Sequence, residues 1–128
     1  MARRLLNGRG EDGFTLLELL LVLFIVALLA AVAVPNVQTI LIKSREAALM
    51  ENLSVMRRAL DEYHADKGQF PEELEQLVTE KYIRFIPNDP VSSNVMWNII
   101  FDDDGLGISD IRSYSRDHGL NEIPYNQW

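Results

Sequence analysis

Gly13-Phe14-Thr15-Leu16-Leu17-Glu18 opens the stretch that decides the fold, and an apolar run continues from it to Val34, just before Pro35. Among the 21 residues that follow Gly13 in this run, only Thr15 and Glu18 are polar. At a rise of ~1.5 Å per residue, such a run forms a helix of roughly 31 Å, which is long enough to cross the hydrocarbon core of a bilayer. The sequence therefore predicts a membrane-spanning helix near its start.

A short basic flank precedes the apolar run and indicates its orientation. The arginines of this flank are Arg3, Arg4 and Arg9. Basic residues favour the cytoplasmic side of a membrane segment, and the neighbouring acids Glu11 and Asp12 carry little weight under that rule. We therefore expect the N-terminus in the cytoplasm and the rest of the chain beyond the inner membrane.

Glu18 is the residue in the apolar run that most needs an explanation. A carboxylate in a membrane segment costs on the order of 2 kcal/mol or more, although less near the segment's ends, and it usually has a partner. A cut between Gly13 and Phe14 would create an α-amine four residues before Glu18, on the same helix face. Because the ordinary pKa of an α-amine is ~8, this group would be charged at neutral pH, and N-methylation would keep the charge. The amine of a neighbouring subunit could supply the same partner, which makes Glu18 a candidate assembly residue.

Two other interpretations of this segment remain open. Ala31-Val32-Ala33 has the small-residue pattern of an ordinary secretory signal cleavage site, which would release a soluble exported protein. The run is longer than the ~7–15 apolar residues of a typical signal peptide, it contains Glu18, and its helical pattern continues past the site. The second alternative is a plain membrane anchor in which Glu18 is incidental.

The helical pattern resumes after Pro35 with a different character. Apolar residues recur at spacings of four and three and form one stripe with charged residues around it: Leu49, Leu53, Met56, Leu60 and Tyr63. Lys67 and Gly68 are typical of a helix end. We expect one helix from about 14 to 66, whose second half packs on its own globular head.

The remainder of the chain predicts a small α+β head. Pro71 followed by the segment 72–78 indicates a short helix, and Pro87-Asn88-Asp89-Pro90 indicates a rigid turn. Strands are expected at Met96–Phe101 and Gly107–Tyr114, and the second span is long enough for two short strands. The predicted fold class is thus α+β: a long N-terminal helix, hydrophobic and then amphipathic, packed on a small antiparallel sheet.

The composition excludes several functions. The 128 residues include 12 Lys and Arg against 19 Asp and Glu, a formal net charge of −7, so we expect no nucleic-acid partner. The absence of cysteine excludes disulfides and thiolate chemistry. The two histidines, His64 and His118, lie in no metal-ligand spacing, and the consecutive acids 102–104 are more typical of a hairpin turn than of a cation loop. We expect no enzymatic activity; a membrane-anchored hydrolase is the alternative.

The quoted N-terminal stretch, with its apolar run and Pro35, resembles the N-terminal motif of prepilins and pseudopilins: Gly before the cut, Phe after it and Glu at the fifth mature position. The resemblance implies cleavage after Gly13 by a prepilin peptidase and methylation of the Phe14 amine. It also implies that Phe14, Glu18 and Pro35 serve assembly. The expected divisions are a leader (1–13), a transmembrane and assembly helix (14–35), its amphipathic continuation (36–67) and a head (68–128).

The order of motifs in the head is similar to the major pseudopilin of type II secretion systems. The pieces that carry the likeness are 68–71, 74, 77–78, 82–83, 86–90, 110–115 and Trp128. The resemblance implies a lollipop-shaped, single-pass subunit with its head in the periplasm. An inner-membrane platform and ATPase would draw it into a periplasm-spanning homo-oligomeric filament, with minor pseudopilins, for protein secretion. The alternative is a major or minor subunit of a surface type IV pilus, used for adhesion, motility or DNA uptake.

The same family resemblance implies a calcium ion in the loop after the last strand. Asp117 falls where a ligand is expected, and Asn121, Glu122 and Asn126 follow it, but the family's second aspartate is missing. Calcium takes about six to eight oxygen ligands, several from carboxylates. Whether the site is retained or lost stays open at this point.

Overall fold

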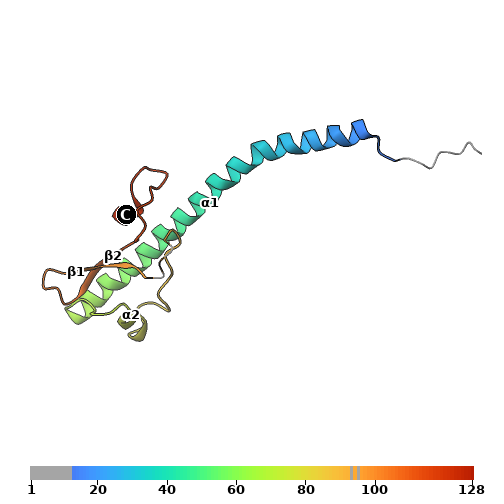
Figure 1. Cartoon of the computed structure of the whole chain (residues 1–128). Coiled ribbons are helices and arrows are strands. Elements are labelled where there is room, and N and C mark those ends of the chain that lie inside the picture. Colours follow the sequence, from blue (N-terminus) through green and yellow to red (C-terminus); the bar gives the residue numbers. More distant parts are fainter. Residues whose placement is uncertain (1–12, 93, 95) are drawn as a thin grey trace, which may run out of the picture. The chain divides into compact units, whose positions relative to one another are not determined.

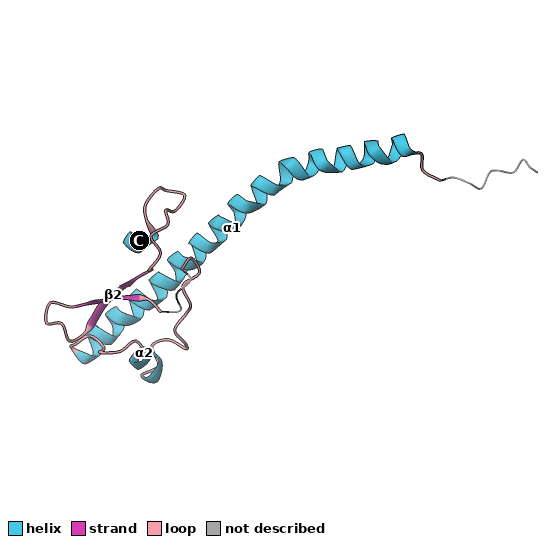
Figure 2. Ribbon diagram, viewed as in Figure 1, coloured by secondary structure: helices cyan, strands magenta, loops and turns pink. Residues whose placement is uncertain are grey.

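The computed structural model describes residues 13–92, 94 and 96–128. Its elements in chain order are α1 (Leu16–Lys67), α2 (Glu75–Thr79), β1 (Asn98–Phe101), β2 (Ile108–Arg112) and the 3-10 helix η2 (Tyr125–Gln127) (Figures 1 and 2). The chain divides into two compact units, Met1–Thr39 and Ile40–Trp128. The basic flank and most of the expected leader lie outside the described residues.

The first part of α1 begins with a side-chain cap that the sequence analysis overlooked. Thr15 Oγ1 accepts a hydrogen bond from the Glu18 N–H at 3.1 Å. This is half of the capping-box pattern Thr-x-x-Glu, in which a hydroxyl just before a helix satisfies one of its first, otherwise unpaired N–H groups. Thr15 therefore starts the helix, and Glu18 occupies its first turn, where a negative charge is favoured.

Pro35 lies inside α1 without ending it. The proline lacks an N–H and so removes one hydrogen bond of the helix ladder. Two side chains of the following turn donate to nearby carbonyls: Asn36 Nδ2 to Val32 O at 3.0 Å and Thr39 Oγ1 to Pro35 O at 3.3 Å. The expectation of one continuous helix is confirmed.

The second half of α1 supplies one wall of the core. Its buried residues are Leu49, Leu53, Met56, Ala59, Leu60 and Tyr63, which include every member of the expected stripe. They cluster with buried side chains from the rest of the Ile40–Trp128 unit, including Leu77, Trp97, Ile108, Ile111 and Tyr125. The helix ends as expected at Gly68, whose φ of 75° is left-handed and whose N–H donates to His64 O at 2.8 Å.

The sheet consists of two antiparallel strands, β1 and β2, with Ile99 opposite Ile111. Both lie within the predicted spans but are shorter. Trp97, which precedes β1 and is expected from the sequence to lie in the strand, is buried and donates its Nε1–H to Pro87 O at 2.8 Å. After β2, the buried Ser113 hydroxyl donates to Asp89 Oδ2, and this contact with the proline-rich turn replaces further strand pairing.

The short helix α2 begins later than predicted, at Glu75 rather than near residue 72. Two bonds occupy the residues just before it: Pro71 O accepts from Ile108 N–H at 2.8 Å, and Glu72 N–H donates to Gln76 Oε1 at 2.8 Å. The backbone at Pro71 is thus hydrogen-bonded to β2, and the helix begins only after this contact. Pro71 is buried at that junction.

Candidate assembly site

The predicted cleavage point lies in exposed, non-helical backbone. Gly13 and Phe14 precede α1, and a Cβ added at Gly13 would have nothing within 4 Å. The Phe14 side chain is 80% exposed. A peptide bond in such a position is accessible to a protease, and a new α-amine at Phe14 would lie just ahead of the first turn of α1.

The Glu18 carboxylate is exposed one helical turn from Phe14. Within the part of the chain that the structure describes, Glu18 forms no ion pair. Its N–H is the group bound to Thr15, so the cap leaves the carboxylate oxygens available. The geometry therefore permits the predicted pairing with an α-amine, from its own chain or from a neighbour.

The surface that surrounds Glu18 is apolar on every side of the helix. From Leu16 to Lys43 no residue is buried, although the large hydrophobic side chains lie close together along this part of α1. A helix that is hydrophobic all round requires an apolar environment. By length and composition this helix can cross a membrane, and it has the character of a membrane anchor.

A second structured feature fastens the C-terminal segment, residues 117–128, to α1 within the Ile40–Trp128 unit. Glu46 Oε1 accepts hydrogen bonds from the Leu120 N–H at 2.7 Å and from the Tyr125 hydroxyl at 2.9 Å. Burial, followed by the bond to Glu46, raises the pKa of Tyr125 to about 12. The sequence analysis missed Glu46 because it reads as one more charged residue on a solvated helix face, and its partners lie 74 and 79 positions away.

The segment packs tightly around this carboxylate. The Trp128 ring meets Tyr125 edge-on at 5.1 Å. A Cβ added at Gly119 would lie 2.6 Å from Trp128 Cζ2 and 3.1 Å from Glu46 Oε1, so any larger residue would force these side chains to move. From α1, Arg57 also reaches the segment: its Nη2 donates to Trp128 O at 2.7 Å, while its Nε pairs with Asp110 Oδ1 at 2.8 Å.

The residues expected to bind calcium lie in this same segment. Asp117 is exposed, and its carbonyl accepts from the Tyr125 N–H at 2.9 Å. Asn126 Oδ1 is buried without a hydrogen-bond partner, whereas Asn121 Oδ1 already accepts from Ile123 N–H at 3.1 Å. Among the described residues no group of three His, Cys, Asp or Glu could hold a metal. Asn126 Oδ1 and the exposed Asp117 carboxylate are two uncommitted oxygens of the kind that calcium prefers, and the calcium site stays a prediction.

Comparison with known proteins agrees with this arrangement of an N-terminal apolar helix and a small head. Residues 8–34 match the family described as the prokaryotic N-terminal methylation motif. The matched span contains the exposed Gly13–Phe14 bond, Glu18 and the whole apolar run up to Val34. With the α+β head, the motif defines a pilin-like membrane protein.

The relatives identify the branch of that class. The type II secretion system core protein G of Klebsiella michiganensis is 30% identical over 101 residues, which cover 66% of this chain and 71% of the relative. The protein of the same name from Vibrio cholerae is 32% identical over 97 residues, covering 64% of this chain and 66% of the relative. The chain belongs to the family of type II secretion system core protein G, the major pseudopilins.

A shorter similarity extends to pilus proteins. Fimbrial protein EcpC of Eikenella corrodens is 36% identical over 61 residues, which cover 48% of this chain and 40% of the relative. A match of this length fits within the residues up to the end of α1, whereas a match to 66% of the 128 residues must include part of the head. The head therefore favours the core protein G family. The comparison with solved structures found no match.

Proposed function

We propose that this chain is a structural, non-enzymatic subunit of a pseudopilus filament in type II protein secretion. The observation that carries the proposal is the exposed apolar half of α1, headed by the Gly13–Phe14 bond and by Glu18 and joined to a head of the core protein G family. This half of the helix has no burial partner within the described chain, so it requires lipid before assembly and other subunits after it.

In this proposal a prepilin peptidase cuts after Gly13, and the Phe14 amine is methylated. The subunit waits in the inner membrane with its head in the periplasm, which follows from the basic flank at the cytoplasmic end. An inner-membrane platform and ATPase then draw it into a filament with copies of itself and with minor pseudopilins. When the subunit moves from lipid into the filament, its apolar helix passes from one apolar environment to another, and this exchange does not select between neighbours. The pairing of Glu18 with an amine therefore determines how neighbouring subunits align.

The intact mass and N-terminal sequence of the protein from its native membrane test the processing step. We expect a start at Phe14 with one additional methyl group. A start at Val34 would instead indicate an ordinary secretory cleavage and would remove the helix on which the assembly argument depends. Deletion of the gene tests the role itself: the release of exported proteins should stop, and continued release would contradict the proposal.

The second candidate function is a subunit of a surface type IV pilus. The similarity to the fimbrial relatives, over 61 and 51 residues, favours it. The same deletion strain separates the two. Loss of surface pili with normal release of exported proteins would favour the pilus.

We also propose that calcium binds the C-terminal segment through the Asp117 carboxylate and Asn126 Oδ1, the uncommitted oxygens described above. When bound, the ion would neutralise Asp117 and satisfy the buried amide oxygen. Calcium at about 100 times its dissociation constant should stabilise the head by about 2.7 kcal/mol and raise its melting temperature by roughly 10–20 °C. Asp117→Asn should abolish the shift, with magnesium as the control. A melting temperature equal in millimolar calcium and in chelator would contradict the proposal.

A further inference from the structure

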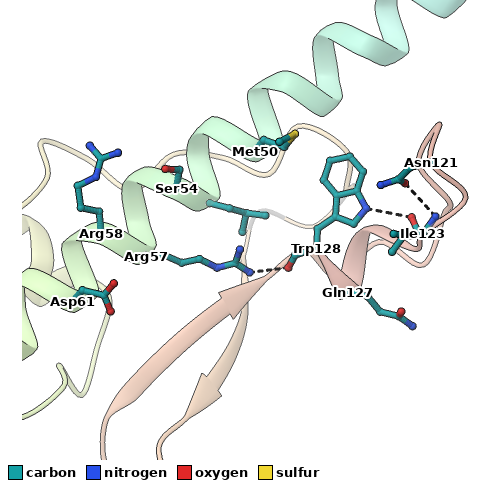
Figure 3. A pocket seen from close by; sticks show the side chains of 10 residues that line it. Met50, Ser54, Arg57, Arg58, Asp61, Asn121, Ile123, Gln127 and Trp128 are labelled. Atoms are coloured by element: carbon teal, nitrogen blue, oxygen red, sulfur yellow. Dashed lines mark hydrogen bonds between the residues drawn. The ribbon is translucent and has the colours of Figure 1, made fainter.

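A groove lies between α1 and the C-terminal segment in the Ile40–Trp128 unit (Figure 3). Its apolar end is formed by Met50, Ile123 and Trp128, of which Met50 and Ile123 are exposed. Figure 3 shows Arg58 and Asp61 at the other end, away from Trp128. The groove thus combines an apolar floor with a charged end.

Arg58 is the available cation at that charged end. Within the described residues it forms no ion pair, whereas Arg57 beside it is already bound to Asp110 and to Trp128 O. In a chain with a formal net charge of −7, an exposed arginine beside an apolar groove favours an acidic partner surface.

The same unit presents a matching surface on the turn between β1 and β2. Asp102 is used internally, because its Oδ1 accepts from the N–H groups of Leu106 and Gly107, both at 3.2 Å. Asp103 and Asp104 remain exposed, and Leu106 beside them is 72% exposed. We call residues 103–106 the hairpin tip: two carboxylates next to one protruding leucine.

The apolar end of the groove and the hairpin tip lie at different positions along α1, which favours a contact between two copies rather than within one. A Cβ on Gly107 would lie 2.7 Å from Phe70 Cβ, which places the tip just past the C-terminal end of α1. The groove follows α1 from Met50 to Asp61, so its apolar end at Met50 is roughly 25 Å back along the helix from Lys67 at ~1.5 Å per residue. Figure 1 shows the hairpin by the last turns of α1 and the C-terminal segment further back along the helix.

We infer that the groove receives the hairpin tip of a second copy of this chain, with Leu106 on the apolar floor and Asp103 and Asp104 toward Arg58. Such a contact is heterologous: each copy offers its tip to one neighbour and its groove to another, and a heterologous contact that does not close into a ring propagates as a filament. The inference rests on the proposed function and adds the head contact to the pairing at Glu18. Asp61 borders the charged end and opposes the acidic tip, so its negative charge weakens the contact.

Cysteine cross-linking tests the contact, because the chain has no cysteine of its own. Leu106→Cys combined with Ile123→Cys should give cross-linked ladders of the full chain in its native membrane under mild oxidation. The matched control pairs Leu106→Cys with Phe85→Cys, an exposed apolar position outside the groove. We expect at least a 5-fold lower yield from the control.

Charge variants sharpen the result. Arg58→Glu should lower the ladder yield roughly 5-fold, as expected for reversing an exposed ion pair. Adding Asp103→Lys and Asp104→Lys should restore it, and Asp61→Asn alone should raise it. Equal yields from the groove pair and the control pair, or no effect of charge reversal, would overturn the inference. If the ladders form but deletion of the gene leaves secretion unchanged, the contact between copies would be supported and the proposed function in secretion would be rejected.

Discussion

Both halves of α1 carry large apolar side chains, but these side chains are exposed in the first half and largely buried in the second. From Leu16 to Thr39 every large apolar side chain is exposed, whereas from Leu49 to Tyr63 most apolar residues form a buried stripe, with Met50 exposed beside it. The difference is the pattern: the first half is apolar on all sides, and the second alternates apolar and charged residues at spacings of three and four. The second half can be buried by its own head. The first half needs an apolar environment that the described residues do not supply.

The largest expected effect breaks this comparison directly. Leu60 is fully buried in the core. Leu60→Ala should lower the free energy of unfolding of the head by about 2–5 kcal/mol, because it leaves a cavity. Leu21, 57% exposed in the first half, is the matched control and should leave head stability unchanged when changed to alanine. Urea unfolding of the full chain in detergent, followed by the fluorescence of buried Trp97, measures both. Equal losses from the two variants would show that the apolar half contributes to the head's core.

Next comes the carboxylate that interrupts the exposed half. Glu18→Ala should allow membrane insertion and normal head stability but reduce filament yield at least ~10-fold, because the amine at each junction would lose its partner. Thr15→Ala is the control, since it removes the helix cap at a cost of about 1 kcal/mol and keeps the carboxylate. Electron microscopy of sheared filaments provides the count. Filaments of normal number and length from Glu18→Ala would refute the pairing.

A smaller effect is expected at the other carboxylate of α1, within the buried half. Glu46→Ala leaves two donors of the C-terminal segment without their acceptor and should lower the free energy of unfolding by about 1–3 kcal/mol. Glu46→Gln retains an acceptor oxygen and should lose less. Trypsin cleavage after Arg116, the exposed residue just before the segment, reports its loosening. Identical cleavage rates for wild type and Glu46→Ala would contradict a fastening role.

The smallest effect appears only in alkali. The pKa of Tyr125 is raised from 10.0 to about 12 in the folded protein by burial and by its bond to Glu46. Because the unfolded chain releases this proton first, the contribution to stability is complete below pH ~10 and declines as pH rises toward 12. The free energy of unfolding measured between pH 9 and 11 should fall less steeply in Tyr125→Phe than in wild type. The pKa of Tyr82 is also raised to about 12, by its hydrogen bond to Asp66, but Tyr82 is present in both proteins and contributes equally to both curves. Parallel curves would show that Tyr125 does not carry the dependence.

The features that follow from local sequence agreed well with the structure. The continuous helix, its buried stripe, its end at Gly68 and the two strands were all predicted, because each depends on spacing or on a residue's own backbone preference. The errors were at boundaries: α2 begins late and both strands are short, since Pro71, Trp97 and Ser113 are held by groups far away in the chain.

The sequence by itself determined the class of this protein, because the glycine–phenylalanine pair, the carboxylate one turn later and the all-round apolar helix are contiguous in the chain. Their chemistry does not depend on the fold of the head. Only the tertiary structure decided how the head is held together and what it presents. Glu46 became the anchor of the C-terminal segment, and Arg57 became a junction between β2 and Trp128, through partners that lie more than 50 positions away in the sequence. Such contacts depend on where the core places each backbone group, and no local spacing encodes that.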